Sequence, residues 1–311
     1  MEYEGAHQEK LFDARAALLL AALLVGNIAL AIGPWFVRLA DTGPVSAGFW
    51  RLLLALPFLA LLARANGQPL KGLPPRTLIL VAIGSAAFAI DLATTNIGVG
   101  MTRFANAILF ANSGSIILMV WGFVIARALP RGFEWLAIIF ALAGSAILMG
   151  RSFEISAETL IGDLFCLVAG LSYAVYLLAL RGERSKDGEA GFGAWSLLVW
   201  VSIFACPLLL TAAIALGEPV WPTDWTPIIL LFVTSQLIGQ GLLVWSLGHF
   251  SPLIIGLALL TQPAVAAVIG YSVFGEVLTG LDLVGMLLLG SALLVARARR
   301  ERAVTPANAG V

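Results

Sequence analysis

The fold is decided by residues Ser251 to Arg300, which read SPLIIGLALLTQPAVAAVIGYSVFGEVLTGLDLVGMLLLGSALLVARARR. This stretch contains two apolar runs of about 20 residues, and each is long enough to cross a hydrocarbon core of about 30 Å as a helix. A short polar break from Gly275 to Asp282 separates the two runs, and the second run ends in a basic cluster. The pattern predicts two consecutive membrane-spanning helices.

An earlier part of the chain, from Thr102 to Gly150, resembles this stretch. At an offset of 150 residues (262 − 112), Gln262 aligns with Asn112. The segment GSALL, which begins at Gly290, aligns with GSAIL, which begins at Gly144, at an offset of 146 (290 − 144). A hydrophobic pattern that occurs twice is typical of membrane transporters built by internal duplication.

The composition agrees with a membrane protein. Of the 311 residues 60% are hydrophobic and only 12% are charged, and the mean hydropathy is +0.98. Soluble domains contain about 25% charged residues, so this chain has too much apolar surface for one soluble core. The formal net charge is zero, which gives no indication of a nucleic-acid partner. The two cysteines, Cys166 and Cys206, lie in apolar runs, which favours a role as small buried side chains.

The whole chain divides into ten apolar spans, five in each half, which predicts an all-α integral membrane fold. The expected domains are a polar tail at 1–15, a first five-helix repeat at 16–150, a second at 151–298 and a polar tail at 299–311. The spans are expected at about residues 16–38, 46–63, 77–98, 102–126, 133–150, 158–180, 192–216, 226–247, 252–274 and 280–296.

The basic residues predict the orientation. If both termini are cytoplasmic, fourteen of the 18 Lys and Arg residues lie in inner segments and three lie in outer loops. Each repeat has an odd number of spans, so the second repeat must be inserted upside down relative to the first. Inverted repeats of this kind are a transporter architecture, with the substrate site near the membrane midplane.

The ten-span plan and three motifs resemble the drug/metabolite transporter superfamily, EamA type. The motifs are GPWFVRLA from Gly33, FWRLLLALPFLALL from Phe49, and SPL…QP…GE…G…L…GSALL in the last two spans. The resemblance covers about Leu18 to Arg300, and its motifs are specific in combination. Within the superfamily the chain is most similar to bacterial inner-membrane exporters of amino acids and related metabolites, including aromatic amino acid exporters of the YddG type.

One departure from the family pattern concerns an acidic residue that such proteins often carry after both the fourth and the ninth helix. Glu276 is present after the ninth span, whereas the matching region of the first repeat reads ARALPRG and contains Arg127. Any role of a symmetric acidic pair therefore does not transfer to this chain.

The resemblance implies a secondary transporter of the bacterial inner membrane that exports small amphiphilic metabolites by alternating access. Amino acids with aromatic or apolar side chains are the expected substrates. The chain lacks a phosphate-binding glycine-rich loop, a metal-ligand cluster and a nucleophile triad, so we expect no enzyme and no cofactor. The expected partners are a small-molecule substrate and the lipid bilayer, with the protein as a monomer. Two alternatives are a permease for drugs, cationic compounds or other metabolites, and a membrane sensor or scaffold.

Asp91 is the outstanding polar residue within a span, because an ionisable group in hydrocarbon costs at least a few kcal/mol. Thr94 and Thr95 share its helix face. One interpretation is a cavity-facing carboxylate that binds a substrate amine or carries a coupling proton. The other is a structural partner for Arg51 or Arg103, and both interpretations stay open.

Amides and aromatic residues at similar depth complete the predicted substrate site. Asn112 and Gln262 are equivalent in the two repeats, which favours a place in the cavity, although buried amides also join helices. Tyr176 aligns with Trp35 at an offset of 141 (176 − 35), and aromatic walls suit flat or amphiphilic substrates. Packing against lipid is the alternative for each aromatic residue. The further candidates are Gln236, Gln240, Asn96, Trp245 and Tyr173.

Overall fold

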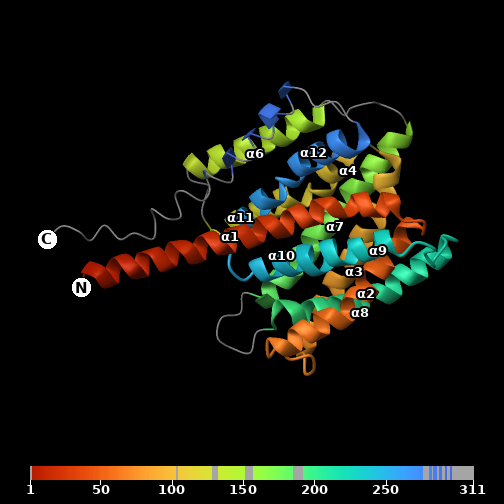
Figure 1. Ribbon diagram of the computed structural model, residues 1–311, viewed down its shortest axis with the longest axis horizontal. Helices are drawn as coiled ribbons and strands as arrows, with labels where there is room; N and C mark the ends of the chain where they lie inside the picture. Colours follow the sequence, from red (N-terminus) through yellow and green to blue (C-terminus); the bar gives the residue numbers. More distant parts are fainter. Residues whose placement is uncertain are drawn as a thin grey trace. The chain divides into compact units, whose positions relative to one another are not determined.

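The computed structural model describes residues 2–102, 104–127, 132–150, 157–184 and 192–275, together with 280–281, 283–285, 287–288, 291–292 and 295. These residues form helices and connecting turns, with no strand in the ranges just given. The helices, labelled in Figure 1, are α1 (Glu2–Leu39), α2 (Pro44–Ala65), α3 (Pro75–Met101), α4 (Phe104–Ala111), α5 (Gly114–Ala126), α6 (Gly132–Gly150), α7 (Ala157–Arg184), α8 (Ala194–Ala215), α9 (Thr226–Leu231), the π-helix η1 (Phe232–Gln240), α10 (Gly241–Ser246), α11 (Pro252–Leu259) and α12 (Gln262–Phe274).

Seven stretches of the described chain are long and apolar enough to cross a membrane, which confirms an all-helical membrane protein. Their outward faces carry large exposed apolar side chains, such as Leu61 and Leu164, as expected for surfaces in contact with lipid. The seven stretches are Ala17–Leu39, Pro44–Ala65, Pro75–Met101, Thr159–Arg184, Ala194–Ala215, Thr226–Ser246 and Pro252–Phe274.

The other three predicted spans differ from a simple helix of full length. The expected span at 102–126 is divided into α4 and α5, and the apolar part of α6 runs only over Gly132–Gly144. The span expected at 280–296 lies largely outside the described residues, as do Glu276, Arg103 and the tail at 299–311. The predicted number of ten membrane spans therefore stays a prediction. At the other end of the chain, α1 begins at Glu2, so the polar segment before residue 16 is helical.

The chain forms two compact units, and each unit takes segments from both halves of the sequence. Unit 1 consists of Met1–Asn96 and Val175–Phe250, and unit 2 consists of Ile97–Ala174 and Ser251–Val311. The boundaries between the units fall within α3 and α7. The predicted division into a repeat at 16–150 and a repeat at 151–298 describes the duplication in the sequence, and it stays a prediction.

In unit 1, α2 packs along α8, and α1 packs along α9, η1 and α10 (Figure 1). Two equivalent contacts join α2 and α8. The backbone N–H of Ser46 donates to Glu218 Oε2 over 2.9 Å, and the backbone N–H of Ser196 donates to Gln68 Oε1 over 3.0 Å. The two donor residues are 150 positions apart along the chain (196 − 46), and so are the two acceptor residues (218 − 68). Because each helix begins where the other ends, α2 and α8 are antiparallel and related by an approximate local twofold axis.

The burial of side chains follows the same local symmetry. Residues 51–70 and 201–220 share the same degree of exposure at nineteen of twenty aligned positions, so the two segments occupy equivalent environments. Gly43 and Gly193 precede the two helices, and a Cβ at either position would overlap the side chain of Glu218 or Gln68, respectively. Glycine at these positions thus permits the acceptor side chain to reach the start of the helix.

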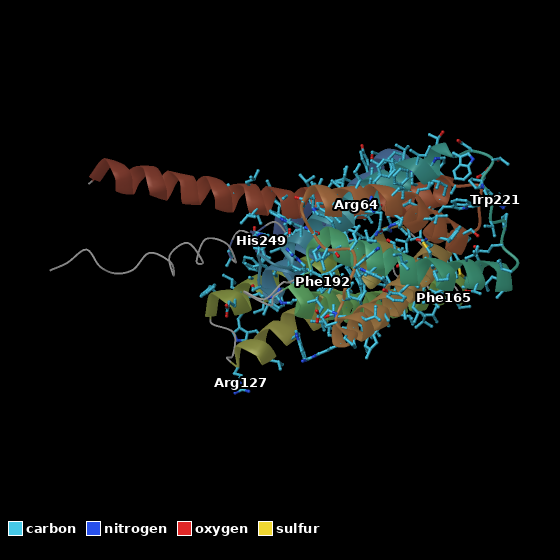
Figure 2. The ribbon with its side chains drawn as sticks, turned by 90° about the horizontal axis from the view of Figure 1, so that it is seen from below. Arg64, Arg127, Phe165, Phe192, Trp221 and His249 are labelled. Atoms are coloured by element: carbon cyan, nitrogen blue, oxygen red, sulfur yellow. The ribbon has the colours of Figure 1, made fainter. Side chains whose placement is uncertain are left out.

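Aromatic side chains gather at one end of unit 1. Trp50 donates from Nε1 to the carbonyl oxygen of Val220 over 2.6 Å, and its ring centroid lies 5.0 Å from those of Trp221 and Trp225. Figure 2 shows Trp221 at this end and His249 toward the other end of the same unit. Tryptophan is enriched at the membrane–water interface, so this cluster marks one boundary of the apolar region.

In unit 2, α4 packs against α12 and α5 packs against α11. The span that contains α4 and α5 and the span that contains α11 and α12 are both interrupted, at places that differ by two residues when Asn112 is aligned with Gln262. The first span breaks at Asn112–Ser113 and the second at Leu260–Thr261. Pro263 lacks an N–H and cannot donate to the carbonyl of Leu259, which explains why α11 stops there. The structure thus divides each of the two expected spans, at 102–126 and 252–274, into two helices.

Candidate functional site

A buried arginine organises the polar residues of unit 1. Arg51 on α2 is 8% exposed, its Nε donates to Gln236 Oε1 over 3.1 Å, and one terminal nitrogen donates to the carbonyl of Ser235 over 3.4 Å. Arginine has donors only, so the amide oxygen of Gln236 must face Arg51 and its Nε2 must point elsewhere. Gln236 is fully buried, and its Nε2 has no hydrogen-bond partner among the described residues. Leaving such a donor unpaired costs about 1–3 kcal/mol.

The two residues that accept hydrogen bonds from Arg51 lie on the π-helix η1. This type of helix is rare and occurs frequently at functional sites. Gln236 lies at the centre of the span Thr226–Ser246, about 15 Å from its start at 1.5 Å per residue. The hydroxyl of Ser235 is a second buried group of η1 that lacks a partner within the described chain. The centre of this span therefore presents two unsatisfied polar side chains at the depth where transporters bind substrates.

A carboxylate on α3 faces the arginine. Asp91 is 8% exposed and interacts electrostatically with Arg51, and Thr95 Oγ1 donates to Asp91 Oδ1 over 3.2 Å. An ionisable residue within a membrane span normally faces the protein interior and pairs with an opposite charge, as Asp91 does here. The structure thus brings Asp91 to Arg51, one of its two predicted partners. Asn96 lies one turn further on and donates from Nδ2 to the carbonyl of Pro44 over 2.9 Å, where it holds the start of α2.

Two aromatic rings adjoin the charged residues. Phe88 stacks on Tyr176 with ring centroids 4.4 Å apart, and the guanidinium carbon of Arg51 lies 5.8 Å from the Phe88 centroid. The hydroxyl of Tyr176 donates to Gln240 Oε1 over 3.3 Å. A guanidinium over an aromatic face is attracted by the ring quadrupole. This arrangement joins α2, α3, the end of α7 and η1 in one cluster, which we call the Arg51 cluster. Its members are Arg51, Phe88, Asp91, Tyr176, Ser235, Gln236 and Gln240.

The amides predicted in unit 2 contact each other. Asn112 donates from Nδ2 to Gln262 Oε1 over 3.0 Å and to the carbonyl of Ile108 over 2.7 Å. Both residues are buried, with 5% and 8% of their surface exposed. Ser115 Oγ donates to the carbonyl of Asn112 over 2.6 Å, which closes the turn between α4 and α5. The contact fits the alternative in which buried amides join helices, and the substrate role of both residues stays a prediction.

The remaining predicted residues are aromatic and half-buried. Trp35 lies on α1 and stacks on Phe36, with ring centroids 5.5 Å apart. Trp245 lies on α10, with its ring centroid 4.3 Å from that of His249. Tyr173 belongs to unit 2. Of the predicted site residues, the structure thus groups Asp91, Tyr176, Gln236 and Gln240 around Arg51.

Sequence reasoning treated Arg51 only as a possible counter-ion and did not include Phe88. A usable signal existed for Arg51, because an arginine within an apolar span is itself an ionisable group that needs a partner. No sequence signal distinguished Phe88 from the other phenylalanines, since its role depends on which side chains α2 and α7 bring to it.

Among the described residues, seven helices are long and apolar enough to cross a membrane, and the Arg51 cluster is buried between four helices of unit 1. The second half of the chain resembles a known family. Residues 160–297 match the model of the EamA-like transporter family, in agreement with the resemblance predicted from the sequence.

Several relatives carry transporter names. The chain is 27% identical over 158 residues to the threonine/homoserine exporter RhtA of Salmonella typhimurium, a match that covers 50% of this chain and 51% of that protein. The chain thus spans about half the length of these exporters. It is also 27% identical over 290 residues to an uncharacterized transporter of Archaeoglobus fulgidus, covering 90% of this chain and 95% of that protein.

The fold has a counterpart among solved structures. A crystal structure with 15% sequence identity covers 94% of this chain and 99% of its own, with a TM-score of 0.72. At this level of identity the likeness concerns the fold alone.

Proposed function

We propose that this protein is a secondary transporter of a bacterial inner membrane that exports small amphiphilic metabolites, with amino acids carrying aromatic or apolar side chains as the preferred substrates. The observation that carries the proposal is the Arg51 cluster. It places a guanidinium, a carboxyl group and an unpaired amide donor in the interior of apolar helices. Such residues are costly in a membrane and mark substrate or ion pathways.

The proposed architecture is ten spans in two inverted five-helix repeats that alternate access to the substrate site. The reciprocal contacts of Ser46 with Glu218 and of Ser196 with Gln68 support it, because they relate the second helices of the two repeats by a local twofold axis. The hydrogen bond between the equivalent residues Asn112 and Gln262 supports the same symmetry in unit 2. We place both termini in the cytoplasm because the basic residues concentrate in the segments that then lie inside.

The substrate class rests on two further observations. The relatives named threonine/homoserine exporters favour amino acids. The stacked rings of Phe88 and Tyr176 beside Arg51 favour an apolar or aromatic side chain on that amino acid. A second candidate is the export of small hydroxyl amino acids such as threonine and homoserine, which the relatives' names favour over aromatic substrates.

The experiment is uptake into liposomes that contain the purified protein, with labelled phenylalanine, tryptophan, leucine, threonine and homoserine tested singly. Each flux is measured with and without a pH gradient, and protein-free liposomes are the control. We expect saturable flux that is largest for the aromatic and apolar amino acids. Larger flux of threonine and homoserine would select the second candidate. Flux of an aromatic monovalent cation without flux of any amino acid would overturn the proposal in favour of a cation or drug permease.

A further inference from the structure

The amide group of Gln236 has a defined polarity. Its oxygen accepts from Arg51 Nε over 3.1 Å, which leaves the two N–H bonds of Nε2 without a role in this contact. That nitrogen is buried and has no acceptor in the described part of the protein. A buried donor next to a guanidinium is a position where an acceptor with negative charge is favoured over a neutral one.

The carboxyl group of Asp91 belongs to the same cluster as Arg51. Asp91 interacts with Arg51 from α3, and the Oδ1 atom of Asp91 accepts from Thr95. An ionised Asp91 offsets the charge of Arg51, so a ligand that is itself neutral overall adds no net charge to this cluster. An α-amino acid at neutral pH is such a ligand, because its ammonium and carboxylate groups cancel.

We propose, on the basis of the amino acid transport proposed above, that Gln236 Nε2 and Arg51 bind the α-carboxylate of the substrate and that Asp91 binds its ammonium group. The carboxylate supplies the acceptor that Gln236 Nε2 lacks, and it does so beside a guanidinium. The stacked rings of Phe88 and Tyr176 adjoin Arg51, and in this proposal they contact the apolar side chain of the substrate. The substrate class is therefore the zwitterionic α-amino acids, and a carboxylate is required for binding.

This assignment predicts which analogues bind weakly. An amine without a carboxylate leaves Gln236 Nε2 unpaired and adds a positive charge near Arg51, so both effects oppose binding. An acid without an ammonium group adds a negative charge near Asp91. The zwitterion alone satisfies both charged residues and the amide donor.

The test measures how well unlabelled analogues inhibit the flux of labelled phenylalanine into liposomes that contain the full-length protein. The analogues are phenylalanine, 2-phenylethylamine, which lacks the carboxylate, and 3-phenylpropionate, which lacks the ammonium group. For the wild type we expect both truncated analogues to inhibit about tenfold more weakly than phenylalanine, or more weakly still. Equal inhibition by 2-phenylethylamine and phenylalanine would overturn the carboxylate subsite while leaving amino acid transport intact.

The decisive variant is Gln236→Glu. It has the same shape and keeps an oxygen for Arg51, but it replaces the donor Nε2 with an acceptor oxygen. We expect the preference for phenylalanine over 2-phenylethylamine to fall about tenfold or more, mainly through a higher KM for phenylalanine. A preference identical to that of the wild type would mean that a buried water, and not the substrate, satisfies Gln236, and would sink the proposal.

The matched control is Thr234→Val on the same π-helix. Thr234 Oγ1 donates to the carbonyl of Leu230, outside the Arg51 cluster, and the substitution keeps the side-chain shape. This variant should keep the wild-type preference. If Gln236→Glu fails to fold, the comparison of analogues on the wild type still decides the question. Absence of flux for every amino acid would instead refute the proposed function on which this inference rests.

Discussion

The Nδ2 atom of Asn112 donates to Oε1 of Gln262 over 3.0 Å, and these two residues stand 150 positions apart at aligned places in the two halves of the sequence. A residue that contacts its own equivalent lies on a local twofold axis, as in an isologous interface between two subunits. Unit 1 also has a local twofold symmetry, but there the contacts come as a reciprocal pair. Ser46 contacts Glu218, and their sequence equivalents Ser196 and Gln68 contact each other.

The Asn112–Gln262 hydrogen bond should stabilise unit 2 by a measurable amount. Side-chain hydrogen bonds between membrane helices contribute about 0.6 kcal/mol on average and up to about 1.7. We expect Asn112→Ala and Gln262→Ala each to lower the free energy of unfolding, with a coupling of about 0.6 kcal/mol in a double-mutant cycle measured by unfolding in mixed micelles. Ser272→Ala, which removes an exposed hydroxyl on α12, should change little. A coupling of zero would contradict the stabilising role.

The side chain of Glu218 should act as a cap for α2. Its two oxygens accept from the backbone N–H groups of Val45 and Ser46 and from Ser46 Oγ. We expect Glu218→Ala to lower the free energy of unfolding by about 1 kcal/mol, because these N–H groups have no partner within the helix. Glu218→Gln should lie between the wild type and Glu218→Ala in a thermal unfolding measurement, since it keeps one oxygen without the charge.

The reverse substitution tests the symmetry of this cap. Gln68→Glu places a negative charge near the start of α8, where the helix dipole favours it by about 0.3–1 kcal/mol. A Tm that rises for Gln68→Glu and falls for Glu218→Gln would show that the two positions are equivalent. Wild-type behaviour of Glu218→Ala would mean that water replaces the carboxylate without loss.

Gly114 should not tolerate a side chain. A Cβ there would overlap the carbonyl oxygen of Gly170, so α5 and the facing part of α7 must separate to admit it. We expect Gly114→Ala to lower the free energy of unfolding by about 1–3 kcal/mol, because backbone offers little room to yield. The control is Gly100→Ala on α3, where no atom lies within 4 Å of the added methyl group, and where alanine should stabilise the helix slightly. Equal stability of the two variants would contradict close packing at Gly114.

Asp41, in the connection between α1 and α2, should contribute less to the stability of the protein at acidic pH. The side-chain hydroxyl of Thr223, followed by the backbone N–H groups of Asp224 and Thr223, donates to Asp41 and lowers the pKa of this carboxyl below its ordinary value of 3.8. Because the folded pKa lies below the unfolded one, the stabilisation is present above the unfolded pKa and is lost as the pH falls through the folded pKa. Asp41→Ala should therefore be less stable than the wild type near pH 6.

The measurement is thermal unfolding of both proteins between pH 6 and about pH 3. The difference in Tm between wild type and Asp41→Ala should shrink as the pH falls below about 4. Thr223→Val, which removes the hydroxyl donor, should show a smaller difference from Asp41→Ala over the same range. A difference in Tm that does not change with pH would contradict the assigned hydrogen bonds.

The position of the apolar spans could be predicted from the sequence because length and hydropathy alone determine them. The expected span at 46–63 corresponds to Pro44–Ala65, and the expected span at 226–247 corresponds to Thr226–Ser246. The interruptions are predictable only in part. Pro263 is a sequence signal for the break at Leu260–Thr261, whereas Asn112 is compatible with a continuous helix by propensity. The π-helix within Thr226–Ser246 packs against α1 and α2, which are distant in the sequence.

Part of the candidate site could be predicted from the sequence. Asp91, Gln236 and Gln240 are polar residues within apolar spans, and such residues need partners, which made them candidates without any structure. The partner of each residue could not be predicted, because the sequence does not show whether a side-chain amide binds a substrate or another side chain. Asn112 and Gln262 illustrate this point, since the sequence favours a place in the cavity but leaves helix joining open, and the structure joins them to each other while their substrate role stays a prediction.

The contact of Arg51 with Gln236 also has a consequence for the synthesis and membrane insertion of the protein, because 185 positions separate the two residues along the chain. At a synthesis rate of about 5–20 residues per second, roughly 10–40 s pass between the emergence of the arginine and that of its amide partner. Asp91 emerges only 40 residues after Arg51 (91 − 51) and is the earlier of the two partners. We therefore expect Asp91 to be the first partner available to Arg51 in the nascent chain, and its replacement by Asn should reduce the yield of inserted protein more than the stability of the finished one.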